Sequence, residues 1–205
     1  MGGAIGRSNL GFRLQWTLER SMEPVLYFLS ALLVLAAGYL IFRILVRRDY
    51  LRRGRLSPLS TLLEYIAIGL WAYHGYINRP ADWPAIHVGP ALRILGWVLF
   101  AGGVALLLII ILALGVRRSH GGQVSGLRQT GPYRFTRNPQ ALAFWVAMIG
   151  YGLLWPTWQH VGSVALIVLL THMMVRTEEE HLQDVFGEEY ERYRQRVPRY
   201  LGRPG

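Results

Sequence analysis

A short polar loop between two apolar stretches carries residues that could bind an anionic group. Glycine and proline form tight turns whose backbone N–H and C=O groups remain free, and Pro139 suits the first turn of the helix that follows. A helix N-terminus favours negative charge. The loop is therefore a candidate cradle for a carboxylate-bearing ligand; the alternative is a turn whose arginines only hold a membrane interface. It reads Gly131-Pro132-Tyr133-Arg134-Phe135-Thr136-Arg137-Asn138-Pro139.

Three consecutive acids, Glu178, Glu179 and Glu180, follow the last long apolar stretch. Acidic residues beside a membrane gain nothing from anionic lipid, so a functional role is worth seeking. Glu178 is nearest to the apolar boundary and is the candidate to face the loop. For Glu179 and Glu180 we expect a solvated helix face with partners one turn away.

Membrane-spanning helices must position these residues. The chain has 205 residues, of which 52% are apolar and 17% are charged, and the charges cluster between long apolar stretches. One soluble core of this size would not use so much apolar material. We predict an all-α integral membrane protein of about five transmembrane helices with a C-terminal cytoplasmic helical cap. The expected spans are 24–46, 60–77, 90–116, 139–155 and 158–175, since a bilayer core is roughly 30 Å thick.

The arginines predict the topology. The net charge of +10 comes from Arg alone, and five arginines lie in the loop after the first span, at positions 47, 48, 52, 53 and 55. The positive-inside rule places this loop in the cytoplasm, with the N-terminus outside and the C-terminus inside. We expect contact with membrane and no nucleic acid. The absence of Lys favours a GC-rich bacterial source, and hence the bacterial inner membrane.

The fourth and fifth spans form a helical hairpin around Pro156. Because a hairpin leaves and returns on one side, the loop before it and the acids after it should face each other at the cytoplasmic surface. Residues 176–196 keep helical spacing, with Gly187 as a break. The chain has no Cys and its six His residues lack ligand spacing, so no metal site is predicted.

Two motifs, in this order, resemble the isoprenylcysteine carboxyl methyltransferase and phospholipid methyltransferase family. The first is the loop from Gly131 to Pro139. The second lies about forty residues on and comprises Glu178-Glu179, Leu182, Phe186-Gly187, Tyr190, Tyr193 and Arg196-Val197-Pro198. The resemblance covers roughly 123–198. Residues 1–205 then form one polytopic domain, with N-terminal helices in 1–122 and a cofactor-binding region in 123–198.

The resemblance implies a methyltransferase that uses S-adenosyl-L-methionine (SAM), bound at the cytoplasmic face, and methylates a lipophilic small molecule or lipid. It implies cofactor contacts from the loop, the start of the next helix and the first glutamate. These residues are Ser125, Gly126, Leu127, Arg128, Tyr133, Asn138, Pro139, Gln140, Ala141 and Glu178. No residue stands out as a general base, so we expect orientation rather than acid–base catalysis. The acceptor atom and the oligomeric state stay open.

Two further residues are candidates for substrate contact. His172 lies two turns before Glu178 and could line a substrate cavity; the alternative is a hydrogen-bonded packing histidine. Prenylcysteine enzymes place an Arg one turn before the first Glu, where this chain has Met174. Arg176 is close in sequence, but its side chain should point about 160° around the helix from Met174.

The chain departs from the family pattern at three positions. Ser125 replaces a usual His, Ala141 replaces a common Tyr, and Met174 replaces the Arg of the prenylcysteine enzymes. The alternative function is therefore a non-catalytic membrane scaffold or a transporter accessory protein that retains the fold.

Overall fold

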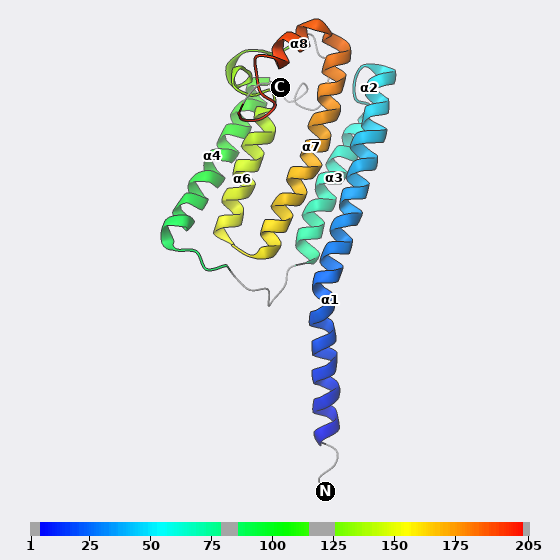
Figure 1. Ribbon diagram of the computed structural model, residues 1–205, viewed down its shortest axis with the longest axis vertical. Helices are drawn as coiled ribbons and strands as arrows, with labels where there is room; N and C mark the ends of the chain where they lie inside the picture. Colours follow the sequence, from blue (N-terminus) through cyan, green and yellow to red (C-terminus); the bar gives the residue numbers. More distant parts are fainter. Residues whose placement is uncertain (1–4, 79–85, 115–125, 203–205) are drawn as a thin grey trace.

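The protein is a bundle of helices in which one central helix contacts two flanking groups. The computed structural model describes residues 5–78, 86–114 and 126–202, with side chains from Met22 onward except that of Leu114. Helix α7 lies between α1 and α3 on one side and α4 and α6 on the other (Figure 1). Every element in the described ranges is helical: α1 (Ile5–Tyr39), η1 (Leu40–Val46), α2 (Arg47–Arg53), α3 (Pro58–Ile77), α4 (Pro90–Leu114), η2 (Gly131–Arg134), α6 (Pro139–Leu154), α7 (Trp158–Phe186) and α8 (Glu188–Arg194).

The first helix continues through a π-helical segment, η1, into α2. A π turn bonds residues five apart and widens the helix, which is common at functional sites. At this bulge the carbonyl of the fully buried Phe42 accepts a hydrogen bond from the Thr177 hydroxyl of α7 at 3.0 Å. The widened turn is thus joined to the central helix.

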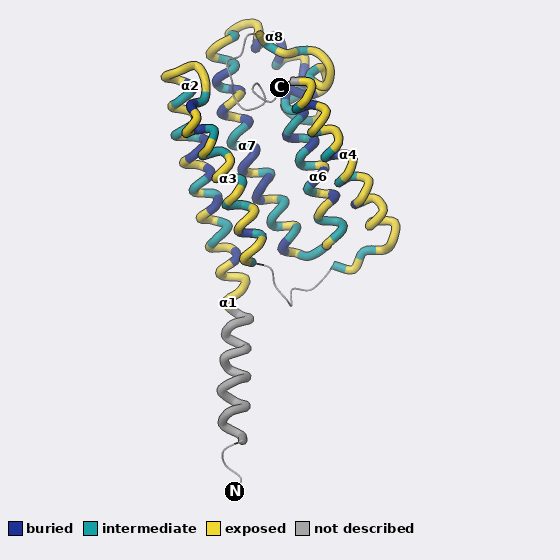
Figure 2. The backbone as a smooth tube through the Cα atoms, turned by 180° about the vertical axis from the view of Figure 1, so that it is seen from behind, coloured by how far each residue is buried: buried dark blue, intermediate teal, exposed yellow. Residues whose placement is uncertain are grey.

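Helix α7 supplies much of the buried core. Leu166, Ile167 and Leu170 pack with Val34 of α1. Buried positions recur along α7, whereas α4 is mostly exposed (Figure 2). Such a distribution places α7 at the centre and leaves the apolar side chains of α4 for lipid contact.

The predicted hairpin is confirmed, and its second arm is longer than expected. Thr157 caps α7 by accepting a hydrogen bond from the His160 N–H at 3.2 Å. Helix α7 then runs without a break to Phe186, so the three acids extend the same helix as the apolar segment. Gly187, with φ of 49°, ends α7, and α8 starts at Glu188, as the predicted break requires.

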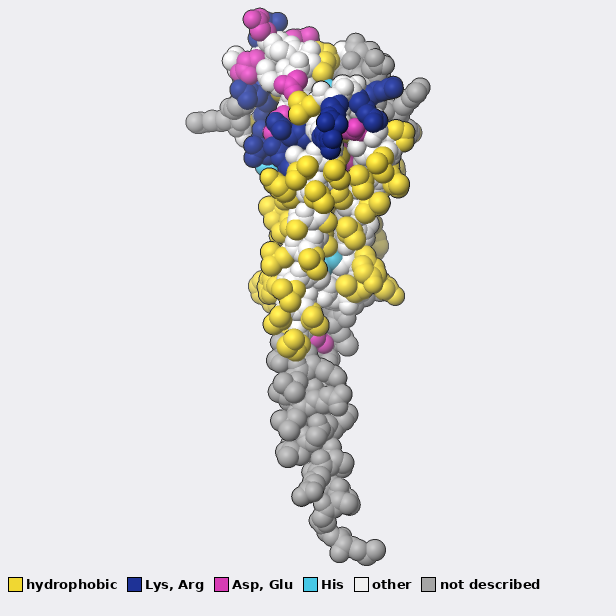
Figure 3. All heavy atoms as spheres, turned by 90° about the vertical axis from the view of Figure 1, so that its right-hand side faces the viewer, with side chains coloured by type: hydrophobic (Ala, Val, Ile, Leu, Met, Phe, Trp, Pro, Cys, Tyr) yellow, Lys and Arg dark blue, Asp and Glu magenta, His cyan; other side chains and the backbone are white. Residues whose placement is uncertain are grey.

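Three helices in the described ranges are long and apolar enough to cross a membrane: Met22–Arg53, Pro90–Ala113 and Trp158–Phe186. The other two expected spans correspond to α3 and to the shorter apolar helix α6. An apolar belt covers the face of the bundle seen in Figure 3, and arginines gather directly beyond it at the end that carries α2 and α8. We call this the arginine-rich end.

Helices α4 and α6 pack through glycine and alanine. A Cβ atom added to Gly103 would lie 2.5 Å from the backbone nitrogen of Ala147 and 2.8 Å from the Ala143 carbonyl oxygen. One added to Gly150 would overlap the Phe100 backbone nitrogen. Small residues let two helix backbones approach closely, which is the usual basis of packing within a membrane.

This contact predicts that alanine substitution has different effects on stability at two adjacent glycines. Gly103→Ala should lower the free energy of unfolding by about 1–3 kcal/mol, because overpacking forces α4 and α6 apart. Gly102→Ala is the matched control, since its added Cβ meets nothing within 4 Å; it should change stability by less than about 1 kcal/mol. Thermal unfolding in detergent measures both. Equal effects would contradict the close helix contact.

Candidate functional site

The loop before α6 is a tight turn, as predicted. Gly131 has φ of 62°, a left-handed conformation that favours glycine, and residues Gly131–Arg134 form the 3-10 helix η2. The Phe135 N–H donates to the Pro132 carbonyl at 3.1 Å. The turn directs the chain back towards α7 and delivers Thr136, Arg137 and Asn138 to the protein interior.

The C-terminal segment after α8 holds this loop in place. The backbone N–H of Arg137 donates to the Pro198 carbonyl at 2.9 Å. The Thr136 hydroxyl and the Asn138 side-chain amide both donate to the Arg199 carbonyl, at 3.0 and 3.1 Å. Three hydrogen bonds between segments about sixty residues apart therefore fix the loop against the C-terminal segment.

Glu179 joins the loop and the C-terminal segment to α7, and its predicted solvent exposure is wrong. Its carboxylate accepts hydrogen bonds from Asn138 Nδ2 and Arg199 Nε, each at 2.9 Å, and lies 3.5 Å from Arg137 Nε. The side chains of Glu179 and Arg137 are only 7% and 3% exposed. Charges this well buried need partners, and the loop and the C-terminal segment bury Glu179 by supplying them.

Glu178 points to the other side of α7 and remains free. Among the described residues it makes no hydrogen bond or ion pair, and it is exposed. Burial chiefly, and then the Glu178 carboxylate, raise the pKa of Tyr133 well above its usual value, while Arg128 lowers it. These effects show that Glu178, Tyr133 and Arg128 share one electrostatic environment. Three of the predicted cofactor residues thus lie within electrostatic range of one another, and Tyr50 and Glu64 lie within range of Glu178 too.

Helix α8 contacts Tyr133 through the side chain of Tyr193. The Tyr193 hydroxyl donates to the Tyr133 carbonyl at 2.7 Å. Tyr190, Tyr193 and Val197 form a buried cluster against which Leu127 packs. Burial, opposed by the positive charge of Arg137, raises the pKa of Tyr193 to about 12, so this hydroxyl stays protonated and remains a donor near neutral pH. Leu127, a predicted cofactor contact, has a packing role as well.

The N-terminus of α6 offers donors to a ligand. Asn138 is its N-cap residue but makes no side-chain cap, because its amide group is bonded to Glu179 and Arg199. Two residues on, the buried Nε2 atom of Gln140 has no hydrogen-bond partner within the described residues. An uncapped helix start beside an unpartnered amide donor suits an anionic group. Pro139 and Ala141 are buried.

The other predicted residues have mixed placements. Ser125 lies outside the described residues, and Gly126 is open, with nothing within 4 Å of an added Cβ. His172 Nδ1 is 3.0 Å from the Tyr200 hydroxyl, a hydrogen bond of the kind that the packing alternative requires, and its contact with a substrate stays a prediction. Arg176 is exposed on the side of α7 opposite Glu178.

Sequence reasoning missed Arg199 and Tyr200. Arg199 binds Glu179, and Tyr200 lies against Trp145 with a ring separation of 4.5 Å. The sequence feature that could have indicated them is their position directly after Pro198, because a proline after a helix often turns the chain back towards the protein.

The Glu179 network predicts that two neighbouring acids differ in their structural importance. Glu179→Gln should destabilise the protein by about 3–5 kcal/mol, since it leaves buried Arg137 without its anion. Glu178→Gln, the matched control one residue away, should not lower the unfolding temperature, because Glu178 has no partner among the described residues to lose. Thermal unfolding in detergent compares them. If both variants unfold like the wild type, Glu179 does not hold the loop.

Comparison with known proteins identifies the family. A sequence model described as phospholipid methyltransferase matches residues 91–189, from α4 into α8. An uncharacterized protein of Haemophilus influenzae is 33% identical over 60 residues, which are 29% of this chain and 87% of that protein. No solved structure matches. The family match starts at α4, earlier than the motifs, and includes η2, α6 and the three acids. The chain belongs to the phospholipid methyltransferase family, which contains the isoprenylcysteine carboxyl methyltransferases.

Proposed function

We propose that the protein is a SAM-dependent methyltransferase that modifies a lipophilic acceptor at the cytoplasmic membrane surface. Family membership supports methyl transfer in a membrane protein. The arginine-rich end supports a cytoplasmic site through the positive-inside rule. In this proposal α3 and α6 also cross the membrane, which completes five spans.

The unpaired Glu178 carboxylate is the observation that carries the proposal. A carboxylate without a partner in the described part of the chain, exposed beside Tyr133, suits the hydroxyl or ammonium groups of SAM. Gln140 Nε2 and the uncapped α6 N-terminus suit the carboxylate of the same molecule. The residues present therefore fit the charge pattern of the cofactor.

Catalysis would depend on alignment rather than on acid–base chemistry. When bound, the cofactor supplies an electrophilic methyl group on a sulfonium. The chain's part is to hold that group and the acceptor in line and to keep water away, which favours a displacement in which positive charge is lost. Glu178 would bind the cofactor, and the loop that Glu179 fixes would set the distance between the cofactor and the acceptor.

The alternative is a scaffold that has lost its chemistry, in line with the departures at Ser125, Ala141 and Met174. Ala141 is buried within α6, and Met174 packs against the buried cluster of Ile41, Phe42, Val46, Tyr50 and Ala67. Neither side chain carries a charged or hydroxyl group that could bind a ligand. A scaffold could still bind the cofactor. Only turnover separates the two functions.

The test is cofactor binding to the detergent-purified full chain by calorimetry. Wild-type protein should bind SAM saturably, and Glu178→Gln should weaken binding about tenfold, the usual cost of losing one charge-assisted hydrogen bond. Glu188→Gln removes the same charge from a side chain that is 93% exposed on α8 and should bind like the wild type.

Transfer of a labelled methyl group into total membrane lipid then separates enzyme from scaffold. Product that disappears with Glu178→Gln supports the enzyme. Binding without product supports the scaffold. Folded protein that does not bind SAM at all would contradict the proposal.

A further inference from the structure

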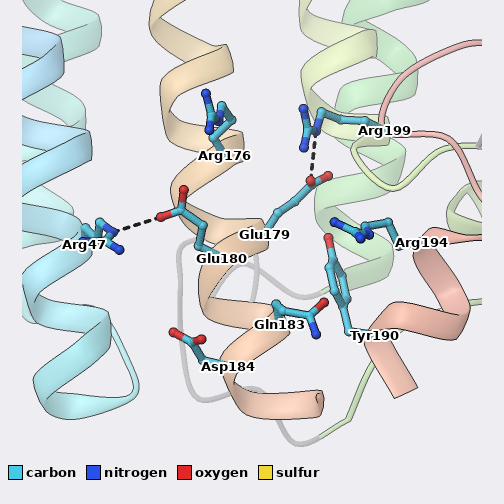
Figure 4. A pocket seen from close by; sticks show the side chains of 9 residues that line it. All are labelled: Arg47, Arg176, Glu179, Glu180, Gln183, Asp184, Tyr190, Arg194 and Arg199. Carbon is cyan, nitrogen blue, oxygen red and sulfur yellow. Dashed lines mark hydrogen bonds and ion pairs between the residues drawn. The ribbon is translucent and has the colours of Figure 1, made fainter. Parts of the chain in front are cut away.

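A polar cavity lies on the face of α7 opposite Glu178. It has a volume of about 320 Å³ and is formed by α2, α7, α8 and the C-terminal segment (Figure 4). On α7, Arg176, Glu179, Glu180 and Gln183 recur three or four residues apart and so share one side of the helix. Glu178 points about 160° away from Arg176. The cavity is therefore separate from the proposed cofactor site.

Each acid of this cavity that makes ion pairs already has two arginines. Glu180 accepts from Arg43 Nη2 at 2.7 Å and from Arg47 Nε at 2.9 Å. Glu179 is paired with Arg199 at 2.9 Å and Arg137 at 3.5 Å. Two carboxylates shared by four guanidinium groups leave a local excess of positive charge.

The cavity also offers unused hydrogen-bond donors. Arg47 and Arg199 both bind their carboxylates through Nε, and their terminal Nη groups make no hydrogen bond within the described residues. Arg176, between them on α7, has neither a hydrogen bond nor an ion pair there, and its side chain lines the cavity (Figure 4). Three arginine side chains thus present free donors, the pattern that suits a phosphate group.

The position of the cavity indicates the source of that phosphate. Arginines lie directly beyond the apolar belt, at the level expected for lipid headgroups (Figure 3). Leu169 lies two turns before Arg176 on the same side of α7, and Ile44 lies one turn before Arg47; both are about half exposed. Asp184, which makes no ion pair within the described residues, lies two turns beyond Arg176, at the end of the cavity away from the membrane.

We propose that this cavity binds the phosphate headgroup of an anionic phospholipid whose acyl chains lie along the apolar surface formed by Leu169 and Ile44. The site uses Arg47, Arg176 and Arg199. It contains the Arg199–Glu179 ion pair that fixes the loop, so a bound lipid also stabilises that ion pair. This inference does not depend on methyl transfer.

The test is lipid binding to the detergent-purified full chain by native mass spectrometry, without SAM. Phosphatidylglycerol should bind more tightly than phosphatidylcholine with the same acyl chains. Arg176→Gln should weaken phosphatidylglycerol binding about tenfold, because one charge-assisted contact is lost. The matched control is Arg55→Gln, which removes an exposed arginine from the loop before α3 at the same end of the protein and should bind like the wild type.

Three results would overturn the site. The first is equal binding of both lipids. The second is equal weakening by Arg176→Gln and Arg55→Gln, which would mean diffuse attraction to basic residues. The third is displacement of the lipid by millimolar inorganic phosphate, which would mean that the cavity takes a soluble phosphate. Unchanged thermal unfolding of Arg176→Gln verifies that the variant is folded.

Discussion

The buried carboxylate of Glu179 is the constraint on which the arginine-rich end depends. A charge with 7% exposure must be paired, and its partners come from two distant parts of the chain: Arg137 and Asn138 of the loop, and Arg199 of the C-terminal segment. Satisfying one buried charge therefore brings the loop, α7 and the C-terminal segment together. The Arg137 N–H also donates to the Pro198 carbonyl at 2.9 Å, and this backbone hydrogen bond joins the loop to the C-terminal segment.

The helical period of α7 gives adjacent acids different tasks. Successive residues point about 100° apart, so Glu179 lies within the network and Glu180 binds Arg43 of η1 and Arg47 of α2. Glu178 faces Tyr133 and has no partner among the described residues. Glu178 can remain available to a ligand because Glu179 and Glu180 make the ion pairs that join α7 to the loop, the C-terminal segment and the first helices. A central helix fixed on three sides is also a rigid support for a reaction that needs alignment.

Much of the fold could be predicted from the sequence, because apolar stretches and arginine clusters give strong local signals. The hairpin, the turn at Gly131 and the break at Gly187 are confirmed. The burial of Glu179 could not be predicted, since its partners lie about forty residues before it and twenty after it, and no local pattern records such contacts. The same limit explains why Arg199 was missed and why Asn138 was read only as a cofactor contact.

The most direct test of the cofactor site is hydrogen–deuterium exchange of the purified protein with and without SAM. Bound SAM should protect the backbone amides in residues 126–141, around Tyr133 and the first turn of α6, and those around Glu178 in α7. Exchange at Arg47 and Asp184 in the opposite cavity should change little. Protection confined to that cavity, or no protection of the loop at saturating SAM, would contradict the assignment of Glu178 and the loop to the cofactor.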